Sequence, residues 1–242
     1  MPEAKRIFLT AEWRDLVMLN YQVDSGLLKP HVPVGTELDS FEGKTYVSVV
    51  GFCFSGTRLW GRIAVPLHTD FEEVNLRFYV RRQVGGEERR GVCFIAEIVP
   101  RRAIAWTARL AYGENYRRFA TTHRIMDRGT GKIAEYGWRA GAQNCRMFAE
   151  TVGAPTLPGE GSLEQFITEH YWGYSRQRSG GSVEYRVAHE RWRVTAAASS
   201  GFEGDGTATY GAAFAEVLRA KPASAFLAEG SAIEVFAGVK IE

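Results

Sequence analysis

Short segments rich in β-branched and aromatic residues, separated by glycine turns, follow one another along most of this 242-residue chain. Such segments favour β-strands, because branched and aromatic side chains pack well on a pleated sheet and glycine permits the tight turns between strands. The chain has 26 glycines, enough for many hairpins. We therefore expect an α+β fold that is mainly antiparallel β, with a closed or nearly closed sheet that hides its edges.

No linker rich in Pro, Ser or Gly divides the chain, so we expect residues 1–242 to form a single domain. Strands are predicted at residues 11–23, 45–54, 71–81, 91–99, 102–112, 133–139, 144–150, 171–176, 182–188, 191–198, 224–228 and 232–236. Asp24 is a predicted N-cap of a short helix, and Ser162 with Gln165 has the spacing of a capping box. A further helix is predicted over residues 209–219.

Composition argues against several classes of function. The formal net charge is +2, too small for long-range attraction to nucleic acid. No segment is apolar enough to cross a bilayer, the N-terminus lacks the apolar core of a secretory signal, and three scattered cysteines suggest reduced thiols. We therefore expect a cytoplasmic protein that binds neither nucleic acid nor membrane. The sequence does not determine the oligomeric state, and a homo-oligomer is compatible with it.

Motifs for metals, phosphates and nucleophilic catalysis are missing from the sequence. The five histidines show neither HxH nor HExxH spacing, so we expect no metal site. Residues 128–132 resemble a Walker loop only superficially, and no GxSxG occurs. We expect no cofactor.

The strand predicted at residues 71–81, FEEVNLRFYVR, carries the clearest pattern. Its alternation places apolar residues on one face and Glu73, Asn75, Arg77 and Tyr79 on the other. A carboxylate, an amide, a fixed cation and a phenol on one surface suit a site for a small anion, with Arg77 as the binding fork. A strand face in solvent, with its charges paired, explains the same pattern equally well.

The sequence also resembles the uncharacterised YqjF-like family. Its most specific match is residues 71–80, and supporting matches are residues 13–16, 23–24, 37–43, 108–113, 161–169 and 235–236. The family lacks an established activity and is similar in turn to acetoacetate decarboxylase, whose fold is a cone-shaped antiparallel β-barrel around a polar funnel. The resemblance implies that the face bearing Glu73 points into such a funnel.

The resemblance puts the decarboxylase mechanism in doubt. That enzyme uses a lysine Schiff base beside a second lysine, within a Pro-Lys-Lys motif. The matching segment here is Pro100-Arg101-Arg102, and arginine cannot serve as a neutral amine nucleophile. The hypothesis is instead that the guanidinium of Arg102 binds a substrate carboxylate.

The leading hypothesis is a pocket for a small organic acid or similar anion, in a lyase-like or decarboxylase-like enzyme without a Schiff-base lysine. A non-catalytic protein that binds or senses a small molecule is the alternative, and a structural scaffold is a third reading. Glu73 is the candidate general base. The candidate ligand-binding residues are Asn75, Arg77, Tyr79, Arg102, Arg109 and Tyr112.

Overall fold

The computed structural model describes residues 6–64, 69–100, 115–177 and 180–242, which are mainly β-structure. The strands are β1 (Ile7–Val23), β2 (Glu37–Leu38), β3 (Thr45–Leu59), β4 (Ile63–Ala64), β5 (Phe71–Val84), β6 (Glu87–Val99), β7 (Tyr116–Arg118), β8 (Ala120–Asp127), β9 (Lys132–Ala140), β10 (Gln143–Thr151), β11 (Trp172–Arg176), β12 (Ser182–His189), β13 (Val194–Glu203), β14 (Ser224–Phe236) and β15 (Val239–Ile241). The helices are α1 (Ser25–Leu28), the 3-10 turn η1 (Lys29–His31), α3 (Leu163–Thr168), α4 (Thr207–Tyr210) and α5 (Ala212–Leu218). The strand predicted at residues 102–112 lies outside the described residues.

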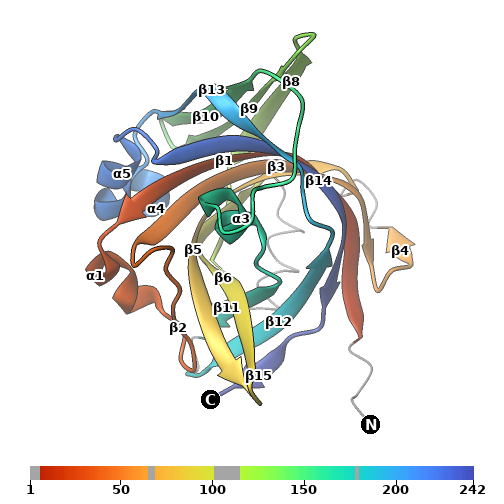
Figure 1. Cartoon of the computed structure of the whole chain (residues 1–242), viewed down its shortest axis with the longest axis vertical. Helices are drawn as coiled ribbons and strands as arrows, with labels where there is room; N and C mark the ends of the chain where they lie inside the picture. The colour runs from red at the N-terminus through yellow and green to blue at the C-terminus, as the bar shows by residue number, and fades with distance from the viewer. Residues whose placement is uncertain (1–5, 65–68, 101–114, 178–179) are drawn as a thin grey trace.

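The long strands close into a ring. Hydrogen bonding connects them in the order β12-β11-β6-β5-β3-β1-β14, and β12 also pairs with β14 from Val187↔Val235 to His189↔Ile233. Neighbours in the ring are antiparallel except β6 and β11, which are parallel. Figure 1 views this ring with α3 inside its outline. The predicted fold class, a mainly antiparallel β-barrel with a few short helices, is confirmed.

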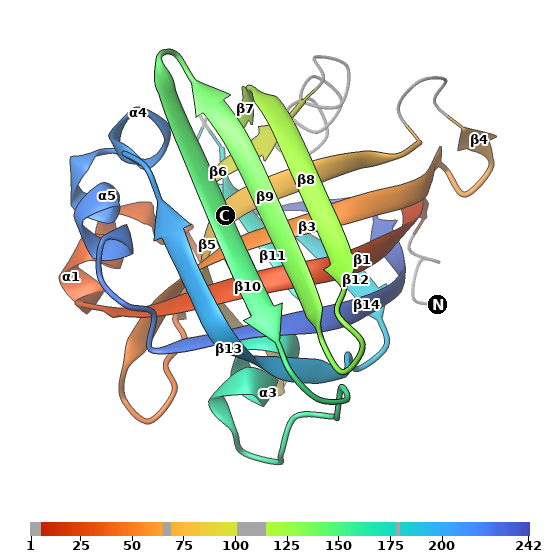
Figure 2. The same ribbon diagram turned by 90° about the horizontal axis from the view of Figure 1, so that it is seen from above.

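A second layer of strands covers one side of the ring. β13 pairs with β14, and β10, β9 and β8 follow it in order, so that these strands cross over β1 and β3 (Figure 2). Outward-facing residues of the ring and inward-facing residues of this layer share one core; among them are Val17, Leu19, Val49, Tyr136 and Met147. Burial of this apolar surface stabilises the contact between the two layers.

The two layers approach closely at Gly51 on β3. A Cβ atom added there would lie 2.6 Å from the ring of Tyr136 and 3.0 Å from the sulfur of Met147. Glycine is therefore required at this position for packing rather than for an unusual backbone angle.

The alternation predicted on β5 agrees with its two faces in the structure. Val74, Leu76, Phe78 and Val80 belong to the core between the two layers. The opposite face points into the interior of the ring. The two charged residues of this face are thus buried and do not lie on a solvent-facing surface: Arg77 is 8% exposed and Glu73 4%.

Both predicted helix caps are present. The Asp24 carboxylate accepts a hydrogen bond from Gly26 N, and the Ser162 hydroxyl accepts one from Gln165 N. These side chains satisfy backbone donors that have no partner within the first helical turn. Within the described part of the chain, every helix is too short to traverse a lipid bilayer.

Several predicted elements have different bounds in the structure. The helix expected over residues 209–219 is split into α4 and α5 at Gly211, whose φ of 86° ends the first helix. The two closing strands expected at residues 224–228 and 232–236 form the single strand β14, which continues through Gly230, where glycine permits a φ of 81°. β8 was not predicted, because its exposed residues lack an alternating apolar pattern.

Candidate functional site

The interior of the ring contains a cavity of about 150 Å³. Inward-facing residues of β1, β3, β5, β6, β12 and β14 line it, together with the chain at and after the end of α3. Most of the wall is apolar and aromatic. The polar residues that line it are Thr57, Glu73, Asn75, Arg77, Glu97, Thr168, His170 and His189.

Glu73 and Asn75 lie side by side on β5 and are 4% and 2% exposed. The Asn75 amide Nδ2 donates a hydrogen bond of 3.0 Å to Glu73 Oε1. Among the described residues, Asn75 Oδ1 has no hydrogen-bond partner. Burial raises the pKa of Glu73 from 4.5 to about 7, against the lowering influence of the Asn75 hydrogen bond and the Arg77 charge. Glu73 can therefore gain or lose a proton near neutral pH.

Arg77 follows on the same face of β5, and its guanidinium is incompletely satisfied. Nη2 donates to the backbone carbonyl of Ile167 at 3.3 Å, and Nε has no hydrogen-bond partner within the described residues. No carboxylate of the described chain forms an ion pair with Arg77. Because a buried cation without a counter-charge is costly, this guanidinium is suited to an anion.

Tyr79 is the next inward residue, but it does not line the cavity. Its ring packs against Phe166 and His170, with centroids 5.3 and 4.7 Å away. Its hydroxyl lies 2.5 Å from the Ser48 hydroxyl, which donates to Asn20 Oδ1 at 2.6 Å. These buried contacts hold the phenol of Tyr79 away from the cavity wall, and its role in ligand binding stays a prediction.

Three other predicted ligand-binding residues, Arg102, Arg109 and Tyr112, lie outside the described residues. Their roles stay predictions.

Sequence reasoning missed Glu97 on β6. Glu97 is the cross-strand partner of Asn75, lines the cavity and is 1% exposed. The pairing of β5 with β6 shifts by one residue between Leu76↔Ala96 and Arg77↔Phe94. This β-bulge lets both Phe94 and Glu97 face the cavity, although they are three positions apart. A single acid in the apolar run GVCFIAEIV is the signal that could have identified it.

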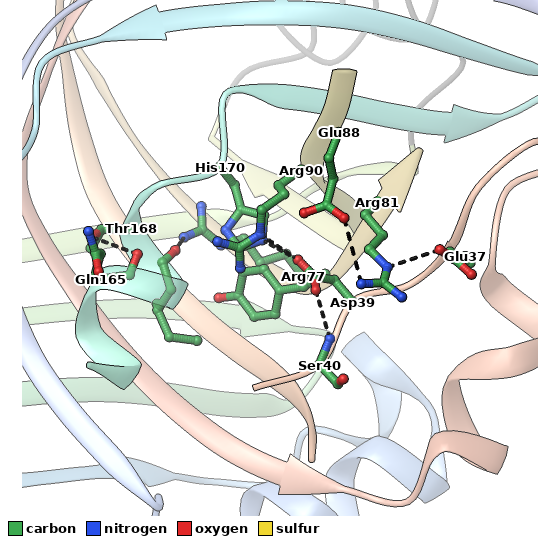
Figure 3. Close-up of polar contacts among 12 residues, drawn as sticks. Glu37, Asp39, Ser40, Arg77, Arg81, Glu88, Arg90, Gln165, Thr168 and His170 are labelled. Atoms are coloured by element: carbon green, nitrogen blue, oxygen red, sulfur yellow. Dashed lines mark hydrogen bonds and ion pairs between the residues drawn. The ribbon is translucent and has the colours of Figure 1, made fainter. Parts of the chain in front are cut away.

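Sequence reasoning also missed His170, which lines the cavity just after α3. His170 Nε2 lies 3.4 Å from Asp39 Oδ2, longer than an ordinary hydrogen bond, and Asp39 also accepts a 2.8 Å hydrogen bond from Arg90 Nε. Figure 3 shows these three side chains converging beside Arg77. Burial lowers the pKa of His170 to about 4, although Asp39 opposes the shift. Burial alone would raise the pKa of Asp39, but His170 and Arg90 outweigh it and lower the value to about 2.

The arrangement is thus a buried cation, a carboxyl that titrates near neutrality and a neutral imidazole around one cavity. The described residues contain no group of three or more His, Cys, Asp or Glu side chains arranged to hold a metal ion.

The family model DUF2071, described as an uncharacterized conserved protein, matches residues 10–232. The chain belongs to this family. This DUF2071 chain is also 25% identical over 183 residues to the uncharacterized protein YqjF of Bacillus subtilis (strain 168), an alignment that covers 74% of this chain and 72% of YqjF. The resemblance to the YqjF-like family is confirmed.

Solved structures similar to this DUF2071 chain are acetoacetate decarboxylase-like. The enduracididine biosynthesis enzyme MppR, complexed with pyruvate, matches with a TM-score of 0.70 and 12% identity over 99% of this chain and 92% of that one. Acetoacetate decarboxylase from Legionella pneumophila matches with a TM-score of 0.68 and 12% identity over 100% of this chain and 92% of that one. At these identities the likeness establishes the shared fold. Among the described residues that line the cavity of the DUF2071 chain there is no lysine.

Proposed function

We propose that this DUF2071 chain binds a small organic acid or similar anion in the barrel cavity and acts on it as a lyase-like or decarboxylase-like enzyme without a Schiff-base lysine. The observation that carries this proposal is Arg77. It is 8% exposed, lines the cavity and has no ion-paired carboxylate among the described residues. A ligand carboxylate would supply the missing counter-charge and two parallel hydrogen bonds.

Glu73 is the proposed proton-transfer group. Its pKa of about 7 gives it comparable protonated and ionised populations at neutral pH, which suits a general acid or base. Glu73 and Arg77 are four residues apart on one strand face, so their Cα atoms are about 13 Å apart at roughly 3.3 Å per residue. Their long side chains extend into the same cavity, and an acid held by Arg77 would lie within reach of Glu73.

The similar structures support the choice of ligand. MppR has been captured with pyruvate, and acetoacetate decarboxylase acts on a keto acid by name. A short keto acid is therefore the first ligand class to test. Asn75 is proposed to orient Glu73 and contact the ligand, with Arg102, Arg109 and Tyr112 as further ligand-binding residues.

The test is calorimetric titration with pyruvate and with acetoacetate. The wild-type protein should bind at least one of them, and Arg77→Met should weaken binding about 100-fold, as expected for loss of a charged hydrogen-bonding partner. Arg81→Met is the matched control, because Arg81 lies on the same strand but is 41% exposed and paired with Glu37 outside the cavity. Equal affinity in the wild type and Arg77→Met, or failure to bind any of the organic acids tested, would refute the proposal.

Turnover separates the enzyme from the alternative of a non-catalytic binding or sensing protein. Release of CO₂ from acetoacetate should be measurable and should be lost in Glu73→Gln. Binding that depends on Arg77 without any turnover would assign the non-catalytic alternative.

A further inference from the structure

The chemical nature of the residues that line the cavity changes along the strands that form it. The residues of β5 that line the cavity are, in order, Arg77, Asn75, Glu73 and Phe71. The register pairs Arg77 with Ser48 of β3 and with Phe94 of β6, and pairs Phe71 with Phe54. The cation and the stacked pair of phenylalanines therefore lie at opposite ends of this row of residues.

Aromatic rings gather at the second end and touch one another. Phe54 and Phe71 stack with centroids 4.5 Å apart at an interplanar angle of 14°. The Trp13 ring meets Phe52 and Phe54 edge-on at 5.2 and 5.8 Å, and Trp192 lies 6.0 Å from Trp13. All five rings line the cavity. Such rings favour a further planar ring, because aromatic pairs gain attraction from stacked and edge-to-face contacts beyond the area they bury.

The size of the cavity agrees with one ring. An apolar cavity of roughly 150 Å³ is large enough to bind benzene, and the cavity here has a volume of about 150 Å³. A two-carbon or three-carbon acid at Arg77 would leave the aromatic end without contacts.

We propose that the ligand is a carboxylic acid bearing a single aromatic ring, with its carboxylate at Arg77 and its ring against Trp13, Phe54 and Phe71. This inference rests on the proposed function, because it uses Arg77 as the anion-binding group. It adds the substrate class: an aryl-substituted acid or keto acid rather than an unsubstituted one.

The test compares matched pairs of ligands by calorimetry: phenylacetate against acetate, and phenylpyruvate against pyruvate. Each aryl acid should bind about tenfold or more tightly than its partner, from burial of the ring. In Phe71→Leu the ratio of the affinity for the aryl acid to that for its small partner should fall several-fold in each pair. The affinity for acetate and pyruvate should stay within about twofold of the wild-type value, since neither small acid reaches this residue. Phe148→Leu is the control, because Phe148 lies on β10 in the second layer and does not line the cavity.

The outcomes separate the two proposals. If the small acids bind through Arg77 and the aryl acids bind no more tightly, the aromatic ligand class is wrong and the proposed function stands. If no acid of either kind binds, both fail. If benzyl alcohol binds as tightly as phenylacetate and Arg77→Met changes neither, the cavity is merely an apolar pocket and both fail.

Discussion

Replacing Glu73 by glutamine should stabilise the protein above neutral pH. Burial raises the pKa of this carboxyl from 4.5 to about 7. Between these values the folded protein holds a proton that the unfolded chain has already released, so stability falls as the pH rises through this window. At about 1.4 kcal/mol per pH unit, the penalty reaches about 3 kcal/mol at pH 7 and above. Glutamine keeps an acceptor for Asn75 and never ionises, so it avoids this penalty.

Urea unfolding followed by tryptophan fluorescence can measure this difference, since the chain has 6 tryptophans. With an m-value of about 3 kcal/mol/M, the midpoint of Glu73→Gln at pH 8 should exceed that of the wild type by about 1 M. The two midpoints should converge near pH 4, where Glu73 is protonated in both the folded and the unfolded states.

Glu203→Gln is a control in which the change in stability should have the opposite sign. The hydrogen bond from Arg146 lowers the pKa of this exposed carboxyl, so its favourable contribution is present above its unfolded pKa and is lost as the pH falls. This variant should be slightly less stable than the wild type at pH 8. A midpoint difference for Glu73→Gln that does not change with pH, or that grows towards acid, would show that Glu73 is not a desolvated carboxyl.

Two further predictions concern other positions. Gly51→Ala should destabilise the protein by about 1–3 kcal/mol, because its new methyl group would overlap Tyr136; an unchanged urea midpoint would mean that the two layers are not packed closely there. The His170 imidazole should remain neutral in an NMR titration from pH 8 down to about 5, because burial lowers its pKa to about 4. Since the unfolded imidazole protonates first, His170 should also reduce stability as the pH falls from about 6.5 towards 4; titration of this signal with a midpoint above 6 would contradict both statements.

The local pattern of the sequence was sufficient for the parts of this fold that depend on neighbouring residues. The alternation on β5 separates Val74 and Leu76 from Glu73 and Asn75 in the structure as it does in the sequence. The Ser162 cap also depends only on residues within one helical turn. The number of short strands predicted a closed or nearly closed sheet, and the family resemblance added that the face bearing Glu73 points into its interior.

The composition of the site was decided by tertiary structure. Asp39, Arg90 and His170 come from a loop, from β6 and from the chain after α3, and no local pattern relates residues so far apart. Glu97 faces the cavity because a bulge in β6 shifts its register, which depends on pairing with β5. Side-chain direction along one strand follows from its period of two, but which groups meet across the barrel depends on strand order and register, and these are set by the packing of the whole chain.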